Sequence, residues 1–192
     1  MIPSISQCRQ LMADHAMLDN IKEHSVMVAR VATMLSSELN RAGVPIDVEL
    51  ALAGALLHDI AKTMCLESGC NHARVGAEIC LAHGFAEVAD IVGEHVMLRD
   101  FSPARLSAKE VVSYADKRVK HDQIVSLGER LEYILGRYGQ GDPHRIALIR
   151  ENFDKWCQLE ERIFSFLAFK PAQVPDLVKE SGELKNDYAE TG

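Results

Sequence analysis

The stretch Glu49-Leu-Ala-Leu-Ala-Gly-Ala-Leu-Leu-His-Asp-Ile-Ala-Lys62 decides how this chain of 192 residues folds. It is a strongly apolar run of helical character that ends in a histidine beside an aspartate, His58-Asp59. Burying an imidazole and a carboxylate without partners costs several kcal/mol, and a bound cation removes that cost. The pair therefore predicts a metal site at the end of a buried helix.

Helical periodicity continues on both sides of this stretch, and no convincing alternating strand segment interrupts it. Capping signals mark the starts of several helices, and Pro143 at a first helical position marks another. These signals are Asp47, Asn71, the Ser107–Glu110 and Ser126–Glu129 capping boxes, and Asp142. The segment 65–71 is expected to form a loop. The expected helices cover about 19–41, 47–59, 71–81, 86–97, 107–119, 126–138 and 142–168.

This pattern predicts an all-α protein with a single-domain helical bundle. Residues 1–169 form the helical domain, with a metal-binding core at about 19–138 and a C-terminal helix at about 142–168. Residues 170–192 are expected to be a polar, flexible tail. The C-terminal helix carries a long apolar stripe that includes Trp156. Core packing is favoured for this stripe, and the seam of a homodimer is the alternative.

The composition excludes several classes of partner. The chain is 47% hydrophobic and 26% charged, and its formal net charge is −7 with acids and bases interspersed. This acidic balance argues against nucleic acid or an anionic membrane as the main partner. No apolar run is long enough to span a bilayer and no signal pattern opens the chain, so we expect a cytoplasmic protein.

The five cysteines predict reduced thiols, because their number is odd and they lack the spacing of a secreted disulfide scaffold. A zinc knuckle built from Cys65, Cys70, His72 and Cys80 is disfavoured, since structural zinc sites usually contain tight Cys-x-x-Cys pairs.

Further candidate ligands lie on the apolar stripes of their own helices. His24, His72, His95 and Asp116 each lie three or four residues from apolar side chains, and this spacing places them on the inward helix face. One such residue alone is more often a hydrogen-bonded core residue. Together with His58-Asp59 they would make a small helical core unusually polar, and metal ions would satisfy all of them. Mixed imidazole and carboxylate ligands suit iron, manganese or zinc.

The order His24, His58-Asp59, Asp116 resembles the HD superfamily of metal-dependent phosphohydrolases. The run His58-Asp-Ile-Ala-Lys62 is similar to the HDIG-like variants of that family, with Ala61 in place of the glycine. The resemblance covers about residues 24–135 and implies the helical fold of HD domains.

The resemblance also implies a binuclear centre, because His72 and His95 match the positions that bring in a second metal. One ion would be held by His24, His58, Asp59 and Asp116. His72 and His95 would complete the site of the other ion, with Asp59 as the bridge. His83 is a rival for His72, but it lies at an expected helix stop. The two divalent ions are expected to be iron or manganese, with zinc, nickel, cobalt or magnesium as alternatives.

By the same resemblance Asp59 and Lys62 are the expected catalytic residues, since the matching lysine of similar proteins helps bind substrate phosphate. A solvated cation favoured by the helix dipole explains Lys62 equally well. Arg74, Lys117 and Arg118 are further candidates for phosphate contacts, although charged runs are usually solvated.

The leading prediction is a metal-dependent phosphohydrolase that cleaves a phosphate ester or anhydride of a nucleotide or another small phosphorylated metabolite. Metal-activated water would be the nucleophile. Two alternatives stay open: a di-iron oxygenase of the HD fold, and a non-catalytic metal-containing nucleotide sensor.

Overall fold

The computed structural model describes residues 1–99, 101–102 and 104–180, and the part it describes is predominantly helical. The all-α prediction is confirmed. The α-helices are α1 (Ile5–Asp14), α2 (Asp19–Arg41), α3 (Val48–Leu57), α4 (Lys62–Ser68), α5 (His72–Ala82), α6 (Ala86–Glu94), α7 (Ala108–Lys117), α8 (Leu127–Ile134), α9 (Pro143–Phe164) and α10 (Val174–Glu180). A π-helical segment, η1 (Leu135–Gly139), follows α8, and a short 3₁₀ helix, η2 (Pro171–Gln173), precedes α10.

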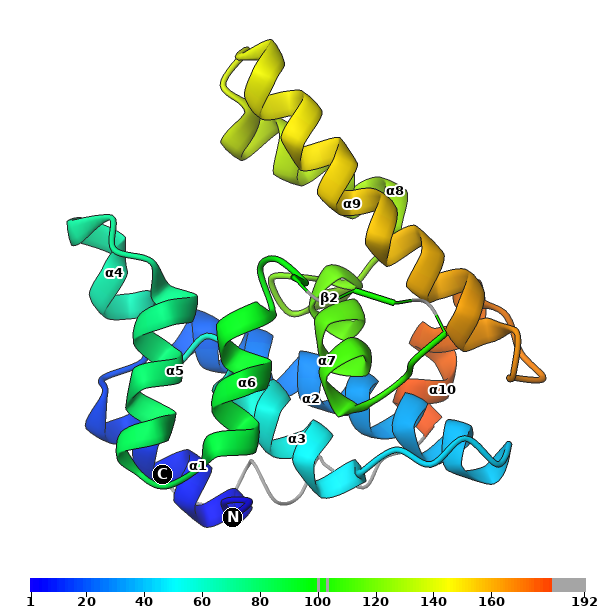
Figure 1. The fold of residues 1–192 in the computed structure, drawn as a ribbon, viewed down its shortest axis with the longest axis horizontal. Helices are drawn as coiled ribbons and strands as arrows, with labels where there is room; N and C mark the ends of the chain where they lie inside the picture. Colours follow the sequence, from blue (N-terminus) through cyan, green and yellow to red (C-terminus); the bar gives the residue numbers. More distant parts are fainter. Residues whose placement is uncertain (100, 103, 181–192) are drawn as a thin grey trace.

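Helix α3 forms the centre of the body and packs against α2, α6 and α7 (Figure 1). Its residues from Ala51 to Leu57 are almost all buried, which explains why the quoted stretch is apolar on every face rather than on one stripe. Gly54 allows α6 to come close, because a Cβ atom at this position would lie 2.7 Å from Ile91 Cδ1. The helix ends at Leu57, and the turn that follows places His58 and Asp59 in the middle of the bundle.

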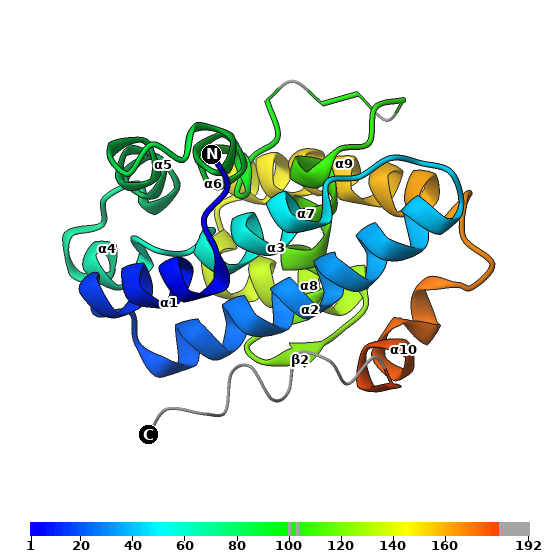
Figure 2. The ribbon, with the colours of Figure 1, turned by 90° about the horizontal axis from the view of Figure 1, so that it is seen from below.

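Helices α8 and α9, joined through η1, form a helical hairpin that extends away from this body in Figure 1 and lies behind α2 and α3 in the view of Figure 2. The base of the hairpin packs on α7, where Phe153, Trp156, Leu159 and Ile163 of α9 are buried. The apolar stripe of α9 therefore packs in the core over this part of the helix. Toward the tip Ile146 and Ile149 are only half-buried.

The predicted caps are observed. Asp47, Asn71 and Asp142 each accept hydrogen bonds from the first turns of α3, α5 and α9, and both predicted capping boxes are present at α7 and α8. Each cap satisfies N–H groups that a helix start leaves unpaired.

Three expectations about local structure are corrected first. A two-residue antiparallel pair, β1 (Val119–Lys120) with β2 (Gln123–Ile124), was not expected, and it forms because His121 turns the chain at a φ of 56°. The expected loop 65–71 is helical up to Ser68, where Gly69 ends α4 in the left-handed conformation. Helix α1 lies in a region for which no helix was predicted, and its Ser4–Gln7 capping box is a signal that the sequence does contain.

The expected tail at 170–192 is also wrong in its first part. Helix α10 buries Val174 and Val178, and the Val178 carbonyl accepts a hydrogen bond of 2.8 Å from Arg30 of α2. Residues 181–192 lie outside the described part of the chain.

The expectation of reduced thiols is wrong for one pair of cysteines. Cys65 and Cys70 form a disulfide at the end of α4, with Cα atoms 4.9 Å apart. Cys8, Cys80 and Cys157 are free. Among the described residues, no helix combines the length and the apolar character needed to cross a membrane.

Candidate metal centre

Six side chains from five helical regions meet beside the turn that follows α3. His24 comes from α2, His72 begins α5, His95 directly follows α6, and Asp116 lies in the last turn of α7. His58 and Asp59 occupy the turn itself. All are buried except His72, whose side chain is 28% exposed. The structure thus brings together every residue that the sequence marked as a metal ligand.

The first cluster surrounds Oδ2 of Asp59. His58 Nε2 lies 3.4 Å from this oxygen and His24 Nε2 lies 3.9 Å from it. Oδ1 of Asp116 approaches the same two imidazoles, at 3.1 Å from His24 Nε2 and 3.8 Å from His58 Nε2. These four groups could hold one cation.

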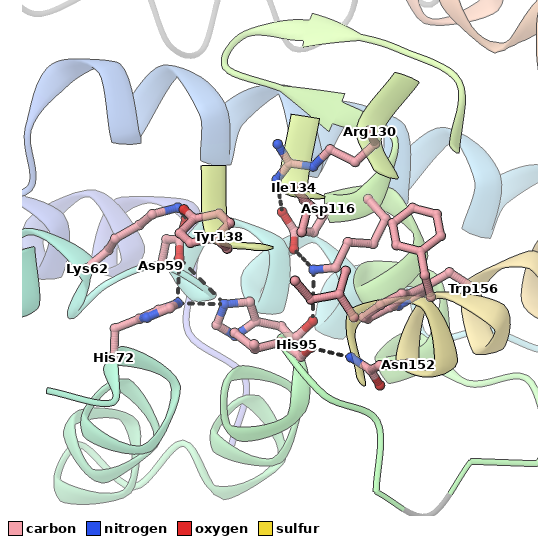
Figure 3. Close-up of a pocket in the computed structure, with 14 residues that line it drawn as sticks. Asp59, Lys62, His72, His95, Asp116, Arg130, Ile134, Tyr138, Asn152 and Trp156 are labelled. Carbon is pink, nitrogen blue, oxygen red and sulfur yellow. Dashed lines mark hydrogen bonds and ion pairs between the residues drawn. The ribbon is translucent and has the colours of Figure 1, made fainter. Parts of the chain in front are cut away.

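The second cluster surrounds the other oxygen of the same carboxylate. Oδ1 of Asp59 lies 3.4 Å from His72 Nε2 and 3.5 Å from His95 Nε2, and the two imidazole nitrogens lie 3.2 Å apart (Figure 3). Asp59 therefore offers one oxygen to each cluster, as a bridging carboxylate would.

Backbone carbonyls fix how three of the imidazoles face the centre. The Nδ1–H groups of His24, His58 and His95 donate to the carbonyls of His121, Ala55 and Val92, at 2.8, 2.7 and 2.7 Å. A neutral imidazole that donates through Nδ1 presents its Nε2 lone pair, and this is the arrangement a metal ligand needs. The sequence could not reveal these carbonyl partners.

The residues fit a bound cation. Nε2 of His58 and Oδ1 of Asp59 are buried and have no hydrogen-bond partner among the described residues. A buried acceptor without a partner costs about 1–3 kcal/mol. In addition, the nitrogens of His72 and His95 face each other, which is favourable only with a proton or a cation between or beside them. Divalent ions would satisfy all of these atoms.

The charge states of Asp59, Asp116 and His95 also suit metal binding. Burial raises the pKa of Asp59, but the neighbouring imidazoles, with His58 first, outweigh it and hold this pKa well below its usual range. For Asp116, Lys117 and His24 outweigh burial in the same way. Burial lowers the pKa of His95 to about 4. Both carboxylates are thus ionised and His95 is neutral at pH 7, as ligands must be.

A cavity of about 320 Å³ opens beside the two clusters. The body of the protein forms one wall, which includes Asp59, His72, His95 and Asp116. The hairpin forms the other wall with residues of α8, η1 and α9 (Figure 3). Among the described residues, three cationic side chains line the cavity: Lys62, Lys117 and Arg130.

Two of the predicted phosphate contacts lie in this cavity. Lys62 Nζ is 2.7 Å from Asp59 Oδ2. Lys117 Nζ bonds to the Asp116 carboxylate and lies 3.2 Å from the carbonyl of His95, over the ring of Trp156. Both lysines can reach an anion held at the centre.

The other two predicted contacts lie elsewhere. Arg74 does not line the cavity, because its exposed guanidinium pairs with Glu78 at 2.6 Å on the surface of α5. Arg118 is buried, and its donors bind Tyr114, Glu160 and the carbonyls of Val125 and Pro171. Arg118 therefore ties α7 to the C-terminal region and is not placed to meet substrate.

Several residues of the cavity were not predicted. Arg130 of α8, Tyr138 of η1 and Asn152 of α9 belong to the hairpin and carry no motif. The only signal that could have pointed to them is the amphipathic pattern of α9, whose stripe runs from the core into the cavity.

The fold and the paired His/Asp clusters define an all-α protein with ligands that could hold divalent metal ions. Residues 21–134 match the HD domain family, which covers more than half of the chain, and the protein belongs to this family. The predicted membership of the HD superfamily is confirmed.

The sequence of this chain is similar to those of several proteins that carry different names. An uncharacterized protein of Methanocaldococcus jannaschii is 28% identical over 153 residues, which cover 71% of this chain and 89% of the relative. A tRNA (cytidine(56)-2'-O)-methyltransferase of Picrophilus torridus is 28% identical over 171 residues, 81% of this chain and 48% of its own. Ribonuclease Y of Treponema pallidum is 34% identical over 125 residues, 57% of this chain and 24% of its own.

This chain thus spans about half of the methyltransferase and about a quarter of the ribonuclease. No solved structure matches it significantly.

Proposed function

We propose that this protein is a metal-dependent phosphohydrolase that cleaves a phosphate ester or anhydride of a small phosphorylated metabolite, such as a nucleotide. The observation that carries the proposal is the Asp59 carboxylate, which offers one oxygen to each of two ligand clusters beside a cavity with cationic side chains. HD proteins are mostly metal-dependent hydrolases, and this membership supports the same chemistry here.

His24, His58, Asp59 and Asp116 would hold one ion, and Asp59, His72 and His95 the other. Two bound divalent ions, with iron or manganese as our proposal, supply an activated water and electrostatic stabilisation of phosphoryl oxygens. The ionised carboxylates of Asp59 and Asp116 and the neutral imidazole of His95 keep these ligand atoms ready at neutral pH. We also propose that the protein is cytoplasmic and that it can form a homodimer.

The chain's own residues then bind and orient the substrate. Lys62, Lys117 and Arg130 surround the cavity with positive charge and can donate hydrogen bonds to phosphate oxygens. The hairpin covers the opposite side and limits the access of bulk water, which strengthens these interactions. Lys62 is the residue best placed to act in catalysis beside Asp59, because its ammonium group is hydrogen-bonded to that carboxylate.

The test combines metal analysis with turnover. The purified protein is reconstituted with Mn²⁺ or Fe²⁺, its metal content is measured, and phosphate release is screened over phosphorylated metabolites while oxygen consumption is recorded. We expect about two ions per chain and phosphate release. Oxygen consumption without phosphate release would instead indicate an oxygenase, and nucleotide binding without either reaction would indicate a sensor.

Asp59→Ala should remove bound metal and phosphate release together, because both clusters lose their shared ligand. Asp122→Ala is the matched control, since Asp122 is an exposed aspartate at the turn between β1 and β2. Full metal content and turnover in Asp59→Ala would contradict the site assignment.

A further inference from the structure

The cavity beside the metal centre has two walls of opposite character (Figure 3). On the side of the body lie the ionised and imidazole ligands, with Lys62 and Lys117. On the side of the hairpin the lining is mainly apolar, because Ile134, Tyr138, Ile149, Phe153 and Trp156 lie there beside the polar Arg130 and Asn152. A ligand of uniform polarity would leave one of these walls without complementary contacts.

The charged wall would complement a strongly anionic group of the ligand. Lys62 and Lys117 of this wall, together with Arg130 of α8 in the hairpin, outnumber the carboxylates of Asp59 and Asp116. Bound divalent ions would increase this surplus. In addition, Nε of Arg130 is buried and has no hydrogen-bond partner among the described residues, and this guanidinium is only 3.8 Å from Asp116 Oδ1. A phosphoryl dianion would complement this wall better than the single charge of a phosphodiester.

The apolar lining of the hairpin wall would complement an apolar group of the ligand close to that phosphate. Tyr138 lies in the π-helical segment η1 and lines the cavity, as Lys62 does (Figure 3). Its side chain is 49% exposed, so its ring is available to a ligand. Ile149 is half-buried on the same wall, and Phe153 and Trp156 pack behind it at 2% exposure.

The available space limits the size of this group. A cavity of about 320 Å³ is at the lower end of the range for small-molecule sites. It admits a phosphoryl group with one compact ring system rather than a long polymer. The apolar wall also belongs largely to residues beyond 134, where the match to the HD domain family ends.

We infer that the substrate is a phosphomonoester whose phosphate is attached close to a flat, apolar ring, and that Tyr138 and Ile149 of the hairpin select it. The phosphate lies against Lys62, Lys117 and Arg130, and the ring lies against the hairpin. This inference deepens the proposed function and rests on it for its turnover measurements. An aryl phosphate is the simplest probe of this chemistry, and methyl phosphate carries the same reacting group without the ring.

The turnover arm measures KM and kcat for phenyl phosphate, methyl phosphate and diphenyl phosphate in the metal-loaded protein. KM should be about tenfold or more lower for phenyl phosphate than for methyl phosphate, and diphenyl phosphate, which has the same leaving group as phenyl phosphate, should be cleaved more slowly than phenyl phosphate. Tyr138→Ala and Ile149→Ala should each reduce the preference for the ring several-fold, mainly through a higher KM for phenyl phosphate.

Leu148→Ala is the matched control, because Leu148 neighbours Ile149 on α9, is 51% exposed and does not line the cavity. It should keep the preference of the unaltered protein. Thermal unfolding of all three variants shows whether each is folded. Equal KM values for phenyl and methyl phosphate, an equal loss of the KM difference in Leu148→Ala, or faster cleavage of diphenyl phosphate than of phenyl phosphate would overturn the inference.

A binding arm keeps the inference separate from the proposed function. Trp156 is the single tryptophan of the chain and lines the cavity, so its fluorescence reports occupancy. Phenylphosphonate should change this fluorescence at about tenfold lower concentration than methylphosphonate, and Tyr138→Ala should narrow the difference. If the screen of phosphorylated metabolites finds no phosphate release, the proposed function fails, while this binding comparison still decides the inference. Equal affinities for the two phosphonates would overturn it.

Discussion

Each oxygen of the Asp59 carboxylate faces a different pair of imidazoles, so single substitutions can separate the two clusters. His72 belongs to the cluster on Oδ1, and its side chain is 28% exposed, which makes its removal tolerable for the fold. His72→Gln should therefore lower the metal content from about two ions to about one and reduce phosphate release by about a hundredfold. Elemental analysis of the purified variant measures the number of metal ions per protein chain.

His83→Gln is the control for this prediction, because His83 is the alternative ligand that the sequence offered. The structure places it in an exposed position after α5, stacked on Phe85. The His83→Gln variant should therefore retain both metal ions. Loss of metal in His83→Gln, with full content in His72→Gln, would reverse the assignment.

Burial of His95 gives the metal-free protein a specific pH dependence. Its pKa falls from an ordinary 6.5 to about 4 in the folded state, so the unfolded chain takes up this proton first as pH decreases. The contribution of His95 to stability is complete above pH 6.5 and is lost as pH falls toward 4, by about 3 kcal/mol at most. Urea unfolding of the chelator-treated protein at a series of pH values measures the slope of the free energy of unfolding against pH.

His95→Gln should show a shallower loss of stability over the same pH range, because glutamine does not titrate. His144→Gln, in an exposed part of α9, should keep the slope of the unaltered protein. Identical slopes in His95→Gln and the unaltered protein would contradict the buried, neutral state of His95.

At the scale of the elements, local signals predicted the helices well wherever a cap and an apolar stripe coincided. Helix α2 begins and ends at Asp19 and Arg41 as expected, and α5 and α9 begin after their predicted caps. Helix α4 was missed because it is short and exposes Met64 and Leu66, so it has no regular apolar stripe. Its end depends on the left-handed conformation of Gly69.

Close approach of α5 and α6 depends on Gly76. A Cβ atom there would lie 2.8 Å from Val92 Cγ1 and 3.2 Å from Ile60 Cγ2, which forces the helices to shift. Gly76→Ala should destabilise the protein by about 1–3 kcal/mol, although alanine is normally the better helix former. Gly136→Ala in η1, where a Cβ atom meets open space, should be neutral or stabilising. Urea unfolding measures the free energy of unfolding of both variants. Equal values for Gly76→Ala and Gly136→Ala would contradict the close packing of α5 against α6.

At the scale of the whole molecule, the sequence predicted the ligands but not the cavity. Periodicity placed His24 and His95 on inward faces, and the structure shows that these faces converge on one point. Arg130 and Tyr138 could not be predicted, because their place depends on how the hairpin packs on α7 beside the metal centre. Arg118 lies next to Asp116 and Lys117 in sequence, yet it turns toward Glu160 and Pro171.

Because the ligands come from α2, α5, α6, α7 and the turn after α3, bound metal should stabilise the whole fold. At an ion concentration about 100 times the dissociation constant, binding to the folded state contributes about 2.7 kcal/mol per site. For a chain of this length that corresponds to a rise in Tm of about 5–10 °C. Thermal unfolding with Mn²⁺ and with a chelator should differ by this amount or more. Asp59→Ala should abolish the difference, whereas Asp122→Ala should keep it. A Tm that does not respond to metal in the unaltered protein would show that these side chains hold no ion.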